Sequence, residues 1–292
     1  MRKSISKYLN IRDDQITVTN GADEGLDIVS KIFIDKYTDT IISTPTYSYY
    51  NIITKIMGGN TISISRKEKF IDDIENILKT IKKKNNIVFL CSPNNPTGNC
   101  IKQKSVIRLL TETDSIIVVD EAYVEFSGNS LINLTNKYDN LIILRTFSKA
   151  FSLAGARVGY IVASKKMIDL LNKVRPPNSL SVISLALADI ALNNLENVND
   201  NIKFIVNERE KCKNFINNIS GVNVFPSEAN FLLIKFNNIK SDIIYNLLLK
   251  QGLIVRNFNN IKGLENCLRF GIRNSQENNI LLNAISEILN KN

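Results

Sequence analysis

The amino-acid sequence predicts an α/β protein: a large domain with a mainly parallel sheet and helices on both of its faces, followed by a smaller α+β domain at the C-terminus. Three observations predict this fold. Short apolar runs alternate with helical patterns through the first half of the chain, which is typical of a parallel sheet with crossover helices. Beyond Gly159 the pattern changes, and longer helical patterns dominate. The length of 292 residues suits one large domain or two unequal ones, so we divide the chain into residues 1–199 and 200–292.

The strands expected in the large domain are short apolar runs that end in turn residues. They are residues 16–19, 40–43, 61–65, 86–91, 116–119, 141–144 and 160–163. One helical pattern begins at the Asn20-Gly21 turn, and a second begins after Pro45, the residue that ends a strand. A third occupies about residues 71–83. Further helices are expected at about residues 165–174, 180–194 and 199–219. The small domain combines expected strands at 231–236 and 267–272 with helices at 240–251 and 276–289.

The composition excludes several kinds of function. The chain has no histidine, which excludes Ser-His-Asp triads and most zinc sites, and its four cysteines lack the close paired spacings of a metal cluster, so we expect no metal. No apolar run reaches the roughly 18 residues that span a bilayer, so we expect a cytoplasmic protein without a membrane partner. The net charge of +9 would attract nucleic acid, but the lysines are dispersed as on solvated helix faces, and we expect no nucleic-acid partner.

Several residues are candidates for chemistry, each with an ordinary alternative. Asp120 directly follows four β-branched residues, so its carboxylate lies at the edge of a buried sheet and needs a cationic partner. Lys149 lies among apolar residues, so either its stem packs with the amine turned outward, or the amine is desolvated and nucleophilic. The Asn20-Gly21 turn opens a helix that is either a seat for a phosphate or an ordinary capped helix. Tyr47 either stacks on a flat ligand ring or packs on the next helix.

These candidates can gather at one place. Each follows a predicted strand or opens a helix, and open α/β sheets bind ligands at the carboxyl edge of their strands. The set comprises the Asp23 loop, Tyr47, Asn95, Asp120, Tyr123, Ser148, Lys149 and Arg157.

Five motifs contain these residues. They are Asn-Gly-Ala-Asp-Glu at 20–24, Thr-Pro-Thr-Tyr-Ser-Tyr-Tyr at 44–50, Cys-Ser-Pro-Asn-Asn-Pro-Thr-Gly at 91–98, Val-Val-Asp-Glu-Ala-Tyr at 118–123, and Arg-Thr-Phe-Ser-Lys-Ala-Phe-Ser-Leu-Ala-Gly-Ala-Arg-Val-Gly-Tyr at 145–160. In the order and spacing of these five motifs, the sequence resembles the fold-type I aminotransferases, which use pyridoxal phosphate. Among them it most resembles the histidinol-phosphate aminotransferase family. The resemblance spans nearly the whole chain.

The resemblance implies roles for the residues around the cofactor ring. Lys149 would bond covalently to the cofactor aldehyde and later move a proton from the substrate. Asp120 would pair with the ring nitrogen and keep it protonated. Asn95 and Tyr123 would hydrogen-bond the phenolic oxygen, and Tyr47 would stack on the ring. The large domain is therefore expected to be the one that binds pyridoxal phosphate.

The resemblance also assigns residues to the cofactor phosphate. The backbone amides of Ala22 and Asp23 would bind it together with Ser148 and Arg157, because a guanidinium group can hold a phosphate through two hydrogen bonds.

Two arginines of the small domain are expected to bind the substrate. Without the resemblance, Arg256 and Arg269 would be taken to pair with surface carboxylates. The resemblance places both at the anionic end of the substrate, with Asn95 and Asn230 nearby. Two guanidinium groups suit a phosphate ester, which favours histidinol phosphate as amino donor and 2-oxoglutarate, a 2-oxo acid, as acceptor.

The resemblance further implies a homodimer with an N-terminal arm that crosses to the partner. The sequence begins close to the Asn20 loop, so we expect the dimer to be weakened by the missing arm. Two alternatives stay open: another activity of the same fold, such as an aromatic or aspartate aminotransferase or a phosphothreonine decarboxylase-like lyase, and a non-catalytic homologue.

Overall fold

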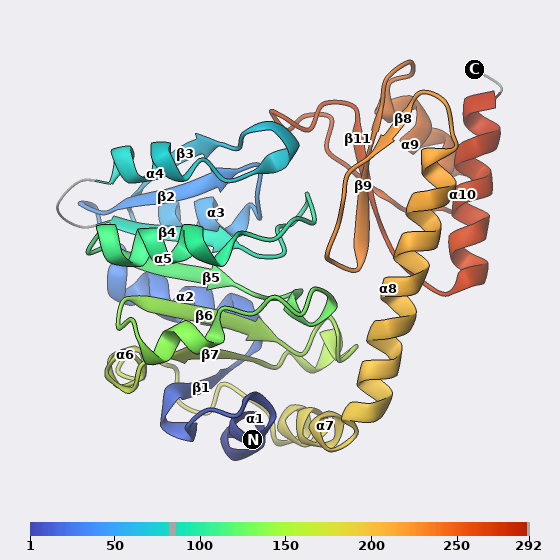
Figure 1. Cartoon of the computed structure of the whole chain (residues 1–292). Helices are drawn as coiled ribbons and strands as arrows, with labels where there is room; N and C mark the ends of the chain where they lie inside the picture. The colour runs from blue at the N-terminus through green and yellow to red at the C-terminus, as the bar shows by residue number, and fades with distance from the viewer. Residues whose placement is uncertain (82–85, 291–292) are drawn as a thin grey trace.

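The large domain is built around one sheet whose strands all lie side by side (Figure 1). The computed structural model describes residues 1–81 and 86–290. Within them, the strand order of the sheet is β1-β7-β6-β5-β4-β2-β3. The strands are β1 (Ile16–Thr19), β2 (Asp39–Thr44), β3 (Asn60–Ser65), β4 (Asn86–Cys91), β5 (Ile116–Asp120), β6 (Leu141–Thr146) and β7 (Gly159–Ala163).

The sheet is mainly parallel, as the sequence predicts. Strands β3, β2, β4, β5 and β6 run parallel to one another, so their carboxyl ends meet at one edge. Strand β7 is antiparallel to both β6 and β1, and it places Gly159 opposite Thr146. The chain therefore leaves the carboxyl edge after β6 and returns to the same edge at the start of β7.

Helices cover both faces of this sheet (Figure 1). Helices α2 (Gly21–Phe33), α3 (Tyr49–Ile56) and α6 (Lys165–Leu171) pack on one face. The other face is covered by α1 (Arg2–Leu9), α4 (Ile74–Thr80), α5 (Gln103–Glu112) and α7 (Val182–Asn193). Short 3-10 helices lie at η1 (Asp13–Gln15), η2 (Glu68–Phe70), η3 (Val124–Phe126), η4 (Ile132–Asn136) and η5 (Ala154–Ala156).

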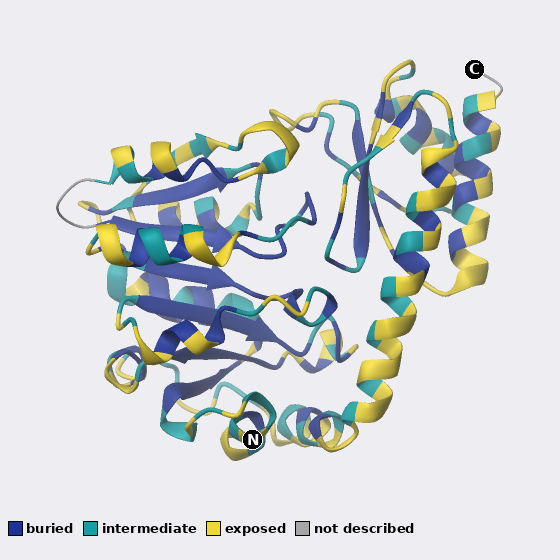
Figure 2. Ribbon diagram, viewed as in Figure 1, coloured by how far each residue is buried: buried dark blue, intermediate teal, exposed yellow. Residues whose placement is uncertain are grey.

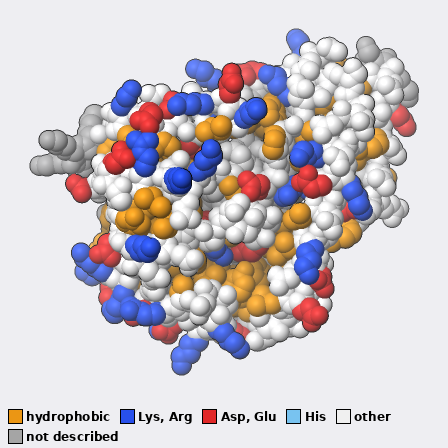
Figure 3. Space-filling model, viewed as in Figure 1, with side chains coloured by type: hydrophobic (Ala, Val, Ile, Leu, Met, Phe, Trp, Pro, Cys, Tyr) orange, Lys and Arg blue, Asp and Glu red, His pale blue; other side chains and the backbone are white. Residues whose placement is uncertain are grey.

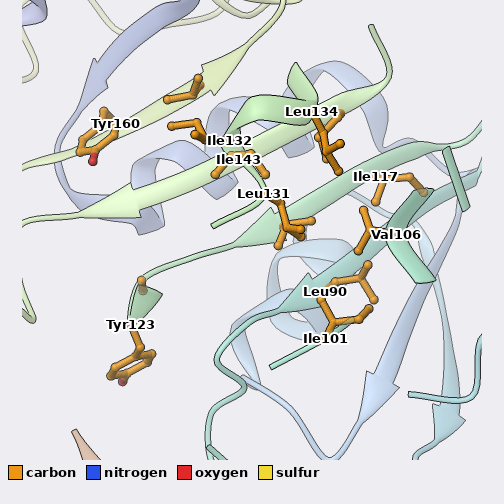
Figure 4. Packing of buried hydrophobic residues seen from close by; sticks show 14 of the residues in the cluster. Leu90, Ile101, Val106, Ile117, Tyr123, Leu131, Ile132, Leu134, Ile143 and Tyr160 are labelled. Atoms are coloured by element: carbon orange, nitrogen blue, oxygen red, sulfur yellow. The ribbon is translucent and has the colours of Figure 1, made fainter. Parts of the chain in front are cut away.

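The central strands are buried along their whole length, while the outer faces of the helices are exposed (Figure 2). Successive strand residues contribute to opposite cores. On one face, Leu90 and Ile117 lie near Val106 of α5, and Ile143 lies beside Ile132 of η4 (Figure 4). Phe89 and Ile142 belong to the core on the other face. Burial on both faces explains why these strands read as continuous apolar runs in the sequence.

The small domain contains a second, antiparallel sheet. Its order is β10-β11-β9-β8, with strands β8 (Val222–Val224), β9 (Phe231–Phe236), β10 (Arg256–Asn257) and β11 (Cys267–Gly271). Helices α9 (Ser241–Lys250) and α10 (Ser275–Asn290) pack on it. Helix α8 (Leu195–Asn217) runs from the large domain to this sheet (Figure 1). The proposed domain boundary at residue 200 falls inside α8 and stays a prediction.

One helix is shorter than the sequence pattern suggests. The helix expected at about residues 71–83 begins only at Ile74, because the Asp73 carboxylate accepts a hydrogen bond from the Asn76 amide at 3.3 Å and caps the first turn. It ends at Thr80, and residues 82 and 83 lie outside the described residues.

The charged surface and the lengths of the helices bear on where the protein can bind. Lys and Arg side chains lie scattered among Asp and Glu on the face shown in Figure 3. Across residues 1–81 and 86–290, no helix combines the length and the apolar character needed to cross a membrane.

Candidate active site

A cavity of about 160 Å³ lies at the carboxyl edge of the large sheet. The structure brings all nine expected cofactor-binding residues to its walls: Ala22, Asp23, Tyr47, Asn95, Asp120, Tyr123, Ser148, Lys149 and Arg157. Cys91, Ala122, Thr146 and Ala154 complete the lining. The residues come from the ends of β4, β5 and β6, the start of α2 and the loop before α3, so the parallel sheet explains why they meet.

Asp120 is a buried anion at the end of β5, 5% exposed. Its Oδ2 accepts a hydrogen bond from the Tyr50 hydroxyl at 2.9 Å and its Oδ1 accepts one from the Ala122 amide at 3.0 Å. Burial raises the pKa of Asp120 to about 6, against the effect of these two hydrogen bonds. Among the described residues, Asp120 forms no ion pair within 4.0 Å. The site therefore suits a ligand that brings a cationic N–H group to this carboxylate.

Lys149 supplies an amine to the same cavity. It follows β6, and its Nζ lies 5.4 Å from the centre of the Tyr123 ring. Burial lowers the pKa of Lys149, and the positive charge of Arg269 lowers it further, whereas Asp120 acts in the opposite direction. A larger fraction of the amine is therefore neutral at neutral pH than for an exposed lysine, which favours nucleophilic attack.

Two tyrosines form walls of the cavity. The Tyr47 hydroxyl donates to Asp23 Oδ1 at 3.2 Å, and its ring meets that of Tyr50 edge to face, with centres 5.6 Å apart. The Tyr123 ring packs edge to face on Phe231 of the small domain at 5.2 Å. Burial is the main cause that raises the pKa of both Tyr47 and Tyr123, so both hydroxyls are protonated and can donate hydrogen bonds.

The start of α2 and the loop after β6 form a cradle for an anion. No side chain of the described residues caps α2 at Asn20, so backbone N–H groups of its first turn point out of the helix end. Arg157 lies beside this end: its Nη1 is 3.3 Å from Ser148 Oγ and its Nη2 is 3.4 Å from Asp23 Oδ2. Arg157 adopts a left-handed backbone conformation with φ 53°, which costs a non-glycine residue about 1–2 kcal/mol.

Two glycines allow the cradle to be this compact. A Cβ on Gly21 would lie 2.5 Å from Arg157 Nη2, and a Cβ on Gly159 would lie 2.5 Å from the Gly21 carbonyl carbon and 2.7 Å from the Ala22 nitrogen. Strand β7 and the first turn of α2 therefore meet backbone to backbone. The helix end, the guanidinium of Arg157 and the Ser148 hydroxyl fit a phosphate group held at this end of the cavity.

Arg269 of β11, in the small domain, does not line this cavity but contacts Asn95 in its wall. Its Nη1 donates a hydrogen bond to Asn95 Oδ1, and its guanidinium carbon lies 4.8 Å from the centre of the Phe231 ring and 5.9 Å from that of Phe258. Burial lowers the pKa of Arg269, and the positive charge of Arg256 lowers it further. A half-buried guanidinium without a carboxylate partner among the described residues can accept an anionic substrate group.

The remaining substrate residues have different settings. Arg256 lies on β10 directly opposite Arg269 on β11, and the two line a hollow of about 540 Å³, but Arg256 is exposed. Asn230 precedes β9, and its carbonyl accepts a hydrogen bond from the Ile272 amide at 2.8 Å. Asn230 is not among the residues that line either hollow.

The structure adds residues that the sequence did not suggest. Tyr50 binds Asp120 from α3, and Cys91 lies next to Asp120 in the sheet register. Arg145 of β6 and Glu121, directly after β5, form a buried ion pair at 2.8 Å, which joins the two strands that precede Lys149 and contain Asp120. Tyr50 lies inside the motif at 44–50, one helical turn after Tyr47, but no role was predicted for its hydroxyl.

The chain is similar to known aminotransferases over almost its whole length. The family model for aminotransferase class I and II matches residues 1–285. Histidinol-phosphate aminotransferase of Caldanaerobacter subterraneus subsp. tengcongensis is 38% identical over 292 residues, covering 99% of this chain and 82% of the relative. The enzyme of the same name from Methanocaldococcus jannaschii is 37% identical over 296 residues, with coverages of 99% and 79%.

A solved structure gives the same result. The histidinol-phosphate aminotransferase from Clostridium acetobutylicum has a TM-score of 0.92 and 28% identity, covering 99% of this chain and 88% of that one. The motifs, the site and these similarities agree, and the chain belongs to the class I and II aminotransferases, within the histidinol-phosphate aminotransferase family.

Proposed function

We propose that this protein uses pyridoxal phosphate to transfer the amino group of histidinol phosphate to 2-oxoglutarate, a step of histidine biosynthesis. The observation that carries the proposal is the combination in one cavity of three features: a buried Asp120 that has no ion-pair partner among the described residues, the amine of Lys149, and an anion cradle at the start of α2. The names of the relatives at 36–38% identity support the choice of substrate.

The residues of the cavity match the functional groups of this cofactor. Bound through a lysine amine, pyridoxal phosphate supplies an electron sink for negative charge on the substrate carbon. Asp120 would accept a hydrogen bond from the ring N–H, and its negative charge would keep that nitrogen protonated. Tyr47 would pack on the ring face, and the Tyr123 hydroxyl and the Asn95 amide would donate to the phenolic oxygen.

The phosphate end would be held by Ser148, by Arg157 and by the backbone amides of Ala22 and Asp23. Such contacts at a helix end combine hydrogen bonds with the positive end of the helix dipole.

Lys149 would act first as nucleophile and then as acid and base. The lowered pKa of Lys149 leaves part of its amine unprotonated, so Nζ can attack a carbonyl carbon. Once the substrate amine has displaced it, the same Nζ can take the proton from the substrate carbon that carries this amine. The Tyr123 ring, which packs on Phe231, lies 5.4 Å from Nζ and forms an apolar wall beside it.

Arg269 would position the anionic end of either substrate. Its guanidinium is held between two aromatic rings and beside Asn95, which would place a carboxylate or phosphate of the substrate close to Lys149. Arg256, on the neighbouring strand, would add a second positive charge for the dianionic phosphate ester.

The test is a visible spectrum with added pyridoxal phosphate, followed by a panel of amino donors. We expect an absorption band in the visible range that is lost when histidinol phosphate is added and restored by 2-oxoglutarate. Release of carbon dioxide from a phosphorylated amino acid would instead favour a decarboxylase, and conversion of aspartate or aromatic amino acids in preference to histidinol phosphate would favour another aminotransferase. Absence of any band would favour a non-catalytic homologue.

We further infer a homodimer in the cytoplasm. Helix α7 exposes Ile183, Leu187 and Ile190, which lie on one face of the helix, and η5 of the cofactor loop packs against α7. A second copy covering this face would bury apolar surface next to the phosphate cradle. The cysteines are free, which suits a reducing compartment. Sedimentation of the protein and of Leu187→Asp tests the dimer, and a monomer at micromolar concentration in the unmodified protein would exclude it.

A further inference from the structure

Tyr50 is a buried tyrosine with no assigned part in the reaction. It lies in the first turn of α3 and is completely buried. Its ring stacks on that of Phe89 of β4 with centres 5.2 Å apart and planes 4° apart, and the Tyr47 ring meets it edge to face. These contacts fix the direction of its hydroxyl, which donates to Asp120 Oδ2 at 2.9 Å.

The hydroxyl of Tyr50 and the Ala122 amide together engage both oxygens of Asp120. Two hydrogen bonds to different oxygens fix the plane of a carboxyl group, because rotation about its Cβ–Cγ bond would break both. One hydrogen bond alone would restrain that rotation less, because only one oxygen would lose its partner. The carboxylate is therefore held in one orientation at the wall of the cavity, where it faces a bound ligand.

We propose that Tyr50 is a positioning residue of the aminotransferase reaction: its hydroxyl holds Asp120 as an oriented anion, ready to pair with the ring nitrogen of the cofactor. This inference rests on the proposed function for the identity of the ligand. The Tyr50 hydroxyl stabilises the ionised form of Asp120 by donating to it, and a protonated Asp120 would offer the ring nitrogen no negative charge.

The charges around Asp120 make this contribution necessary. Six titratable side chains interact with the carboxylate: Asp23 of α2, Tyr47 before α3, Tyr50 of α3, Cys91 of β4, Tyr123 after β5 and Lys149 after β6. Burial favours the neutral form of Asp120 and the negative charge of Asp23 favours it further, while Lys149 favours the anion. The hydrogen bond from Tyr50 is the first cause that lowers the pKa of Asp120 against the effect of burial.

The variant Tyr50→Phe removes this hydrogen bond and keeps the stacked ring. The matched control is Tyr49→Phe, because the neighbouring tyrosine is only half-buried and its hydroxyl donates to Asp27 at 3.4 Å, away from Asp120. Infrared difference spectra of the cofactor-free chain, titrated from about pH 5 to 9, follow the protonated carboxyl, and Asp120→Asn identifies its band. A charge-assisted hydrogen bond of ordinary strength corresponds to about one to two pH units.

We expect the midpoint of the Asp120 band to rise by about one to two pH units in Tyr50→Phe and to stay in place in Tyr49→Phe. A rise of one to two pH units from about 6 lowers the ionised fraction of Asp120 at pH 6.5 by about threefold to 25-fold. With pyridoxal phosphate bound, turnover of Tyr50→Phe at that pH should fall by about this factor, with little change in KM, and recover toward the unmodified protein by pH 9 as Asp120 ionises again. With a cofactor analogue that carries carbon in place of the ring nitrogen, the variant and the unmodified protein should turn over alike.

Each part of the proposal can fail separately. An unchanged carboxyl midpoint in Tyr50→Phe, or a loss of turnover that is the same at every pH and with both cofactors, would overturn the role of Tyr50. A protein that takes up no pyridoxal phosphate would contradict the proposed function, and the titration of the cofactor-free chain would still decide whether Tyr50 holds Asp120 as an anion.

Discussion

The two arginines of the small domain differ in their surroundings, and this difference predicts unequal effects on substrate binding. Arg269 is half-buried between Phe231 and Phe258 and donates to Asn95. Arg256 is exposed on the neighbouring strand. Water screens the attraction between an anion and Arg256 more than that between the anion and Arg269.

The magnitudes follow from these surroundings. A charge-assisted hydrogen bond to a partly desolvated guanidinium contributes about 1.5–3 kcal/mol, so Arg269→Ala should lower kcat/KM for histidinol phosphate by about 12- to 150-fold. An exposed charge contributes at most about 1 kcal/mol, so Arg256→Ala should lower kcat/KM for histidinol phosphate by at most about fivefold. A substrate without a phosphate group, such as glutamate, would bind through Arg269 alone, and Arg256→Ala should leave its kcat/KM unchanged.

The assay is the single-turnover amino-transfer reaction, followed by the loss of the visible band with histidinol phosphate or glutamate as donor. The control variant is Arg273→Ala, an exposed arginine just beyond β11 that pairs with Glu277 at 3.3 Å, which should change neither reaction. Equal losses with both donors in Arg256→Ala would refute the assignment of Arg256 to the phosphate. An unaffected reaction in Arg269→Ala would refute the placement of the substrate anion.

Three further predictions concern the large domain. Lys149→Ala should abolish the visible band, and a borohydride-reducible adduct that survives in the variant would show that another lysine binds the cofactor. Asp120→Asn should retain the cofactor but lose about a hundredfold in turnover, because a neutral partner leaves the ring nitrogen unprotonated; unchanged turnover would contradict its role. Burial raises the pKa of Glu125 from 4.5 to about 7. Protonated Glu125 therefore contributes its full share to the stability of the folded protein below about pH 4.5, and this contribution is lost as the pH rises through about 7. Urea unfolding should therefore find Glu125→Gln similar to the unmodified protein at about pH 4 and more stable by about 1 to 3 kcal/mol at about pH 8; a stability difference that does not change with pH would contradict this.

The residues that line the cavity could be found from the sequence because local signals place each of them at a strand end or a helix start. Asp120 follows a β-branched run that is buried on both faces, and Lys149 follows another such strand. The parallel connection of β4, β5 and β6 then brings these ends together without further information. The same kind of local pattern predicted the mainly parallel sheet and two strands of the small domain, β9 and β11, but not β8 and β10.

Contacts between distant segments could not be found in this way. Tyr50 and Asp120 are 70 residues apart, and nothing around Tyr50 distinguishes it from a core tyrosine. The pair of Arg145 and Glu121 depends on the register of β6 against β5, which the sequence leaves undetermined. The exposure of Arg256 likewise depends on the pairing of β10 at the edge of the small sheet, which the sequence did not predict.

Helix α8 connects the large domain to the small one, so a rotation at one of its ends moves the other end. Its 23 residues correspond to about 34 Å of continuous helix, with one end beside α7 and the other packed under the sheet that carries Arg269. A rotation of about 5° at the α7 end would displace the far end by about 3 Å, comparable to the length of one hydrogen bond. A small rotation where α8 leaves the large domain would therefore be enough to make or break the contact between Arg269 and Asn95. The position of Arg269 thus depends on a helix end far from the residues that it contacts.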